Sequence, residues 1–151
     1  MQKTLHPLAH RALNHCFGCG LENRSGLRLQ FFVDDDNNVV CRTRLAARFA
    51  GPPGHAHGGI IATLLDEAMS KSNRARGVLA MTRHLAIDYL RPVPLNVPLT
   101  LTARHTGTTG RRHHIEAQLA DESGNLLATA KAVFVTVTPE VIEARGRSLL
   151  K

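Results

Sequence analysis

The chain has 151 residues, of which 43 % are hydrophobic and 21 % are charged, with a net charge of +7. This is a globular composition, and no apolar run approaches the ~20 residues that a membrane span requires, which argues against a membrane protein. A chain of this length can bury one self-sufficient core, so we expect a single domain over residues 1–151. Residues 1–15 lack the pattern of a secretory signal, and three cysteines cannot all pair, so we expect a reducing cytoplasm.

The positive charge is spread along the chain, which favours acidic ligands. The aromatic residues are five phenylalanines and one tyrosine, and no nucleic-acid-binding motif appears. We therefore expect neither a nucleic-acid nor a membrane partner.

The first predicted elements are two strands. Residues 27–33 alternate between apolar and mostly polar side chains, as in a strand with one buried face. Residues 34–38 read as a turn, and residues 39–45 then return antiparallel, because so short a link cannot make a parallel crossover.

A helix of about 19 residues is expected from Gly58 onward. At ~100° per residue, its buried side comprises Ile60, Ile61, Leu64, Leu65, Ala68 and Met69. The opposite side comprises Thr63, Asp66, Ser70 and Asn73. Glu67 lies four residues before Lys71, which predicts an ordinary ion pair on the helix surface.

Strands follow the helix. Leu85, Ile87 and Tyr89 share one face of a strand that ends before the prolines of residues 92–98. Turns at residues 106–110 and 121–125 separate three further antiparallel strands, which makes a meander of at least four strands. A short C-terminal helix over residues 139–149 follows, with Thr138 as N-cap, so the core spans residues 16–138.

One helix cannot cover both faces of such a sheet. We therefore predict an α+β fold in which a curved antiparallel sheet wraps around one long central helix. A sheet of this kind leaves open edges, which favours self-association.

Two features of the predicted helix indicate chemistry. Asp66 lies in the middle of the polar side, with no basic residue three or four positions away. At the helix start, His57, Gly58 and Gly59 expose backbone N–H groups that suit an oxyanion. Gly58 and Asp66 are about 12 Å apart along one helix, so they could meet at one substrate only if two chains pair antiparallel across a two-fold axis.

Other chemistries find less support. His55 lies near His57, and Cys16 and Cys19 form a C-x-x-C pair, but Cys41 stands alone and the second cluster of a structural zinc site is missing. We therefore predict no metal.

Arginines occur where predicted strands end. Arg91, Arg111 and Arg112 could bind phosphates of a nucleotide-bearing substrate, although solvated turn arginines explain them equally well.

Four segments together resemble a known family. They are C-F-G-C-G at residues 16–20, G-P-P-G at 51–54, H-G-G at 57–59 with Asp66 nine residues after the histidine, and D-Y-L-R-P-V-P at 88–94. Over residues 16–137 the chain resembles the hotdog-fold acyl-CoA thioesterases of the PaaI-like group, related to 4-hydroxybenzoyl-CoA thioesterase.

The resemblance implies a homodimer or dimer of dimers that hydrolyses acyl-CoA without a cofactor. Asp66 would act as general base or nucleophile, and Gly58, with Gly59 beside it, would donate an N–H to the thioester oxygen while His57 shapes the turn. Gly51 occupies the position where family members often carry Asn or Gln.

Thr63, together with the three arginines, is a candidate substrate-binding residue. Two alternatives stay open: a non-catalytic hotdog protein that binds acyl-CoA or an acyl carrier, and a hotdog enoyl-CoA hydratase or dehydratase.

Overall fold

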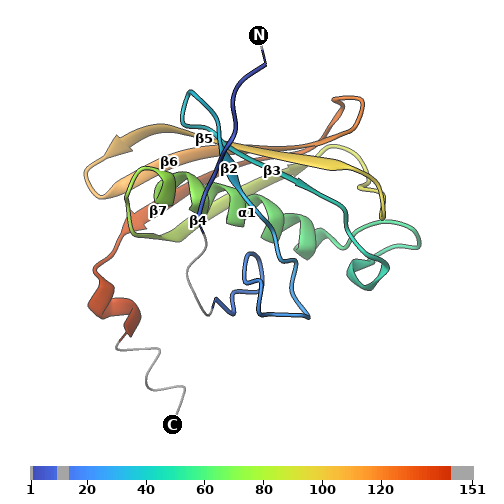
Figure 1. The fold of residues 1–151 in the computed structure, drawn as a ribbon, viewed down its shortest axis with the longest axis horizontal. Helices are drawn as coiled ribbons and strands as arrows, with labels where there is room; N and C mark the ends of the chain where they lie inside the picture. Colours follow the sequence, from blue (N-terminus) through green and yellow to red (C-terminus); the bar gives the residue numbers. More distant parts are fainter. Residues whose placement is uncertain (1, 10–13, 144–151) are drawn as a thin grey trace.

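The computed structural model describes residues 2–9 and 14–143 and consists of one antiparallel sheet and one long helix. The strand order across the sheet is β1-β2-β3-β5-β6-β7-β4. The strands are β1 (His6–Pro7), β2 (Phe32–Val33), β3 (Val39–Thr43), β4 (Ala80–Tyr89), β5 (Leu99–Thr109), β6 (Arg112–Asp121) and β7 (Leu126–Thr136). Helix α1 (Gly58–Ala75) lies against one face of the curved sheet, and a short 3-10 helix, η1 (Ala47–Phe49), precedes it (Figure 1).

Strands β5, β6 and β7 form the predicted antiparallel meander. Gly110 and Gly124 have φ angles of 60° and 84° in the connecting turns, a conformation that glycine adopts without strain. The strand after the helix was wrongly predicted to begin this meander. Strand β4 pairs with β7 at the sheet edge instead of with β5. The proline-rich link of residues 90–98 carries the chain across the end of the sheet from this edge to β5.

The first predicted strand is shorter than its sequence pattern. Leu29 and Phe31 are buried as expected, but the pairing with β3 is limited to β2. Arg28 has a φ of 52°, which interrupts extended backbone. Instead, the N–H groups of Leu27 and Leu29 donate to the carbonyls of Phe17 and Gly18, so this segment pairs with the N-terminal loop.

Helix α1 buries the predicted side chains against the sheet. Ile61, Leu64, Leu65, Ala68 and Met69 are at most 4 % exposed, whereas Ile60 is half-buried. They meet an inner sheet face that includes Leu101, Leu119 and Phe134. The apolar periodicity of the helix thus decides which side faces the sheet.

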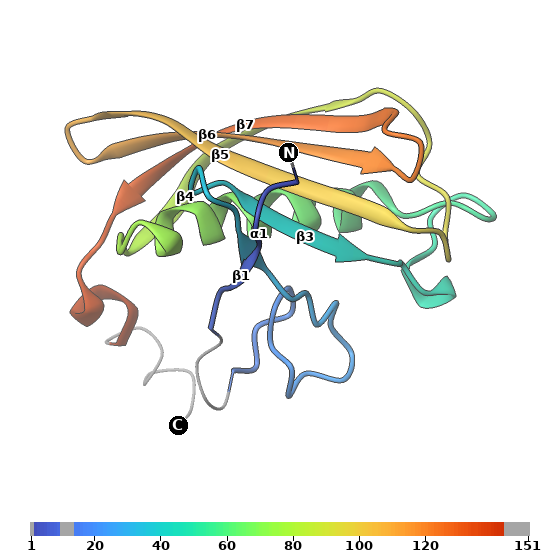
Figure 2. The same cartoon turned by 45° about the horizontal axis from the view of Figure 1, so that its top comes forward.

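The other side of α1 was predicted less well. A loop of residues 14–29 passes along the side of α1 that faces away from the sheet (Figures 1 and 2). Glu67 and Lys71 do pair, at 2.8 Å, but their side chains are only 13 % and 10 % exposed, so the predicted surface pair is largely buried. Asn73, predicted on the polar side, is 1 % exposed.

The predicted C-terminal helix is described in part. Residues 139–143 are helical, and the N–H of Val141 donates to the carbonyl of Thr138. Residues 144–149 lie outside the described residues. Within the described part of the chain, no helix has the length and apolarity needed to cross a bilayer.

Candidate active site

The start of α1 is capped by a histidine. His57 is the N-cap, and its Nδ1 accepts a hydrogen bond of 2.9 Å from the N–H of Gly59. The N–H groups of Ile60 and Ile61 donate to the carbonyl of His57. Within the described residues, the N–H of Gly58 has no acceptor and remains the donor available to a ligand at this end of the helix. Gly59 therefore serves the cap.

Gly51 packs directly against this cap. A Cβ atom added at Gly51 would lie 2.8 Å from the Cα of His57, closer than real contacts allow. A side chain at this position would require the backbone of the cap to move. Residue 51 is the position where members of the resembled family often carry Asn or Gln. Here the backbone of His57 occupies the space that a side chain would need, which is the physical reason for a glycine.

His55 belongs to the loop before the helix. Its Nδ1 lies 3.0 Å from the carbonyl oxygen of Pro53, and its backbone forms an isolated bridge with Pro94. In the described part of the chain, neither His55 nor His57 joins a group of three side chains that could hold a metal.

Asp66 is held by a threonine from the neighbouring strand. The hydroxyl of Thr82 in β4 donates to Oδ1 of Asp66 at 2.7 Å. Burial raises the pKa of Asp66 above its usual range; the Thr82 hydrogen bond opposes this shift, and the charge of Glu67 adds to it. A half-buried carboxylate of this kind is a stronger base than an exposed one.

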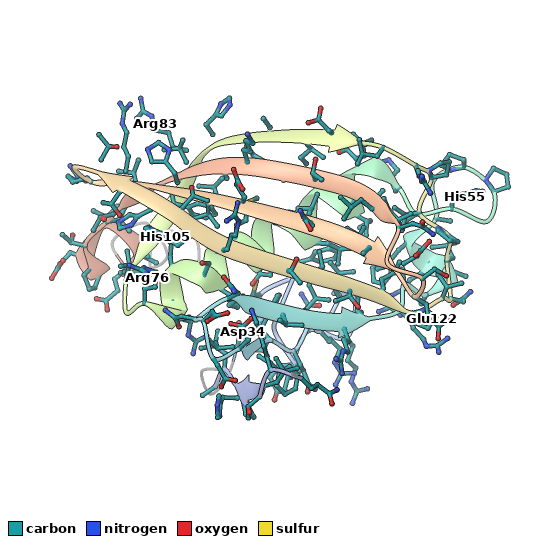
Figure 3. The ribbon with its side chains drawn as sticks, turned by 90° about the horizontal axis from the view of Figure 1, so that it is seen from above. Asp34, His55, Arg76, Arg83, His105 and Glu122 are labelled. Atoms are coloured by element: carbon teal, nitrogen blue, oxygen red, sulfur yellow. The ribbon has the colours of Figure 1, made fainter. Side chains whose placement is uncertain are left out.

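A β-bulge turns Thr82 toward the helix. The register between β4 and β7 shifts between Thr82 and His84, so Arg83 is an extra residue. Thr82 pairs with the buried Phe134, and Leu85 pairs with a buried alanine of the same inner face. Without the bulge, residues 82 and 85 would point to opposite faces, since side chains alternate along a strand. Figure 3 shows Arg83 at the opposite end of the molecule from His55.

The other end of β4 contacts the helix start. The hydroxyl of Tyr89 donates to the carbonyl oxygen of Gly58 at 3.0 Å, although the tyrosine is 54 % exposed. Strand β4 therefore anchors both helix positions of interest: Thr82, near the start of the strand, contacts Asp66, and Tyr89, at the end of the strand, contacts Gly58. Thr82 was not among the site residues predicted from the sequence, because simple alternation from Leu85 points it outward.

The predicted substrate-binding residues lie at separate places. The hydroxyl of Thr63 donates to the carbonyl of Gly59 at 2.9 Å, so it is engaged within α1. Arg91 is exposed and lines a groove of about 440 Å³ together with Gly58 and Tyr89.

Arg111 and Arg112 lie at the opposite end of the sheet. The backbone of Arg91 bonds to Leu127, whereas Arg112 pairs with Val135, and these two positions of β7 are about 26 Å apart. Arg111 donates from Nη2 to the carbonyl of Thr136 at 2.8 Å. One chain thus brings Arg91 to the Gly58 end and the other two arginines to the end where Asp66 meets β4.

A long antiparallel sheet wrapped around one main helix defines the hotdog class of proteins. Residues 53–128 match the family model of the thioesterase superfamily. The chain belongs to the thioesterase superfamily, as a structure described as a thioesterase superfamily protein, 30 % identical with a TM-score of 0.78, also shows. That likeness covers 85 % of this chain and 68 % of the other.

Two further comparisons agree with this family. The acyl-coenzyme A thioesterase THEM4 of Xenopus laevis is 28 % identical over 110 residues, which are 72 % of this chain and 50 % of the relative. The chain spans about half the length of the curated relatives it matches. The PaaI protein of E. coli, from the phenylacetic acid degradation operon, shares the fold with a TM-score of 0.69 at 20 % identity, over 74 % of this chain and 81 % of that one. The predicted hotdog fold and the resemblance to PaaI-like thioesterases are confirmed.

Proposed function

We propose that this protein is an acyl-CoA thioesterase whose active site forms between two copies of the chain. The observation that carries the proposal is the arrangement of α1 on β4: a half-buried Asp66 in the middle of the helix, held by Thr82, and an available Gly58 N–H at the start of the same helix. The two lie about 12 Å apart, too far to act on one carbonyl within one chain. The name of the relative THEM4, an acyl-coenzyme A thioesterase, supports the substrate class.

The free edge of β4 supports a two-fold pairing. Met81 and Tyr89 of this ten-residue edge strand, and Leu90 directly after it, are each more than half exposed. Unpaired strand edges with exposed apolar side chains are sites of association. If two β4 strands pair antiparallel about a two-fold axis near their centres, the Thr82 end of one chain meets the Tyr89 end of the other. Asp66 of one chain then approaches Gly58 of its partner, twice in each dimer.

The proposed chemistry uses these two groups together. The N–H of Gly58 binds the thioester oxygen and stabilises the negative charge that develops on it. In a general-base route, Asp66 takes a proton from an attacking water, and collapse of the tetrahedral intermediate breaks the carbon–sulfur bond while this proton passes to the departing thiolate, which gives the free acid and CoA thiol. In a nucleophilic route, Asp66 attacks the carbonyl and the thiolate leaves, taking up a proton from water; a second water then hydrolyses the mixed anhydride on Asp66 to the free acid and restores the carboxylate. Neither route needs a cofactor or a metal.

The arginines suit the phosphates of CoA in the same dimer. The Gly58 end of one chain carries Arg91, and the Asp66 end of the partner carries Arg111 and Arg112. The proposed pairing therefore draws guanidinium groups from both chains toward each site, where they can bind phosphate by charge-assisted hydrogen bonds. Thr63, between Gly58 and Asp66 on α1, faces the space where the acyl group would lie. Two such dimers could associate further into a tetramer.

Release of free CoA thiol from a panel of acyl-CoA thioesters tests this function. Asp66→Asn should abolish hydrolysis, because the amide is neither a base nor a nucleophile. Activity equal to wild type in this variant would remove Asp66 from the mechanism. Binding of acyl-CoA without any hydrolysis by the wild-type chain would support the non-catalytic alternative instead.

The Gly58 donor can be tested without disturbing the helix. Gly58 is the first helical residue, where proline is tolerated, and His57 before it already has the extended backbone that a residue before proline adopts. Gly58→Pro should lower kcat roughly 10²- to 10³-fold, because it deletes the N–H. Gly58→Ala keeps the N–H, and its Cβ would lie 3.7 Å from Tyr89, an ordinary contact, so it is the matched control. Equal losses in both variants would contradict the donor assignment.

We also propose a cytoplasmic location. All three cysteines are free thiols, as expected in a reducing compartment. A relative from Saccharomyces cerevisiae, 27 % identical over 84 % of this chain and 52 % of its own length, is named as a mitochondrial membrane protein. Cell fractionation of the native protein distinguishes the two locations.

A further inference from the structure

The structure brings three metal-binding side chains together outside the candidate active site. The ligand atoms of Cys16, Cys19 and Glu67 all lie within 4.8 Å of one another. The sulfur of Cys16 is 3.8 Å from both carboxylate oxygens of Glu67. The sequence showed no further ligands for the C-x-x-C pair. The fold brings one beside the pair, Glu67 of helix α1.

The loop that carries the two cysteines is tightly built. The N–H of Gly20 donates to the carbonyl of Cys16 at 2.8 Å, and the amide of Asn14 donates to the sulfur of Cys19 at 3.3 Å. A Cβ at Gly18 would lie 2.6 Å from a carboxylate oxygen of Glu67. A Cβ at Gly20 would lie 2.5 Å from the backbone nitrogen of Cys16. The loop's own backbone leaves no room for a side chain at residue 20, and a side chain at residue 18 would displace the carboxylate of Glu67.

The charges of this cluster can be balanced around a divalent cation. Lys71 lies 2.8 Å from Glu67 and balances its charge. When two thiols lose their protons to a bound divalent ion, three negative groups face the ion and Lys71, and the cluster stays neutral. A neutral cluster is the condition for burying these groups at low cost.

We propose that Cys16, Cys19 and Glu67 bind one divalent ion of the zinc type, which joins the N-terminal loop to helix α1. Two thiolates and a carboxylate are zinc ligands, and zinc lies about 2.3 Å from sulfur and about 2.0–2.2 Å from oxygen. The ligand atoms need to draw together by about 1 Å to reach a tetrahedral arrangement. The cluster opens into a groove of about 620 Å³, from which water can supply the fourth ligand.

Cobalt loading of the full-length chain tests the site directly. The protein is reduced, stripped with a chelator and titrated with Co²⁺, which reports thiolate ligands by a charge-transfer band in the near ultraviolet. We expect binding of about one ion per chain and displacement of Co²⁺ by Zn²⁺. If the reduced wild-type protein shows no charge-transfer band, the proposal is overturned. This holds even if Cys16 and Cys19 form a disulfide when the protein is oxidised in air.

Matched cysteine variants assign the ligands. Cys16→Ser removes a ligand at an exposed position and should abolish the two-thiolate signal without unfolding the chain. Cys41→Ala removes a thiol buried at 0 % exposure in β3 and should leave the signal intact. Glu67→Gln should weaken binding roughly 10-fold or more while the band remains. Unchanged binding in Cys16→Ser would overturn the site, and unchanged affinity in Glu67→Gln would overturn the three-ligand set. The readout is independent of thioester hydrolysis.

Discussion

The charge of Asp66, the candidate base, is set by opposing effects. Burial raises the pKa of this carboxyl, whereas the Thr82 hydroxyl, which donates to it at 2.7 Å, lowers it. Because a base acts only when ionised, hydrolysis should fall as the pH drops through this pKa.

Asp66 and Gly58 could be found from the sequence, because helical periodicity places them on one element. Thr82 could not, because its direction depends on a bulge that simple alternation does not reveal.

Substitution of Thr82 should move the pH profile. Thr82→Val removes the hydrogen bond that lowers the pKa of Asp66, so the acidic limb of kcat/KM should shift to higher pH. Thr82→Ser keeps a hydroxyl donor and should keep the wild-type profile. The measurement is kcat/KM for acyl-CoA hydrolysis across the acidic range. A profile that does not move in Thr82→Val would show that this hydrogen bond does not tune the base.

Gly51 offers a second test at single-residue scale. Gly51→Ala places a Cβ 2.8 Å from the Cα of His57, so the helix cap has to shift, and stability should fall by about 1–3 kcal/mol. Gly107→Ala is the control, because no atom lies within 4 Å of the corresponding Cβ and its φ is not in the left-handed region. Urea unfolding of the two variants measures the difference. Equal stability would mean that the cap adapts to a side chain at residue 51.

At the scale of elements, helix α1 lies between two layers that differ in how well the sequence predicts them. Its sheet side follows from apolar residues at helical spacing, so Leu64, Leu65 and Met69 were correctly predicted as buried. Its other side is covered by an irregular loop whose close approach depends on Gly18 and Gly20. Loop conformations leave no periodic pattern, so the burial of Glu67 could not be predicted.

The buried ion pair should matter more than exposed ones. Lys71→Met leaves the carboxylate of Glu67 without its partner in a covered site, and we expect a loss of about 3–5 kcal/mol. Lys131→Met is the matched control, because the Lys131 side chain is 81 % exposed and lies 3.8 Å from Glu116; its effect should be under about 1 kcal/mol. The measurement is the free energy of unfolding in urea. A similar, small loss in both variants would show that water reaches the Glu67 pair.

The bulge in β4 can be removed as a unit. Deletion of Arg83 restores regular alternation, so Thr82 should turn to the outer face and Asp66 should lose its donor. We expect a loss of kcat/KM of roughly 10-fold, with the sheet retained in circular dichroism. Arg83→Ala keeps the extra residue and should keep activity. If the deletion variant hydrolyses acyl-CoA as fast as Arg83→Ala, the bulge has no part in the site.

At the scale of the whole molecule, one edge strand of the sheet contacts helix α1, the only long helix among the described residues, both at its start and at its middle. Strand β4 lies at the sheet edge with its length open to a second copy, and each of its ends supports one of the two groups proposed to act. The sequence predicts an open edge in general terms, but it does not reveal which strand is left there. That depends on the link of residues 90–98, which crosses the end of the sheet from β4 to β5 and which no local pattern encodes.

The distance between Gly58 and Asp66 has a genetic consequence: two inactive chains should complement each other. In a mixed dimer of Asp66→Asn and Gly58→Pro chains, one site receives both lesions, and the other receives an intact Gly58 and an intact Asp66. Equal mixing with free exchange of subunits should restore about a quarter of wild-type activity, because half of the dimers are mixed and each has one intact site. The assay is CoA release after the two purified variants are mixed. A mixture that stays as inactive as its components after verified exchange would mean that each site is built within one chain.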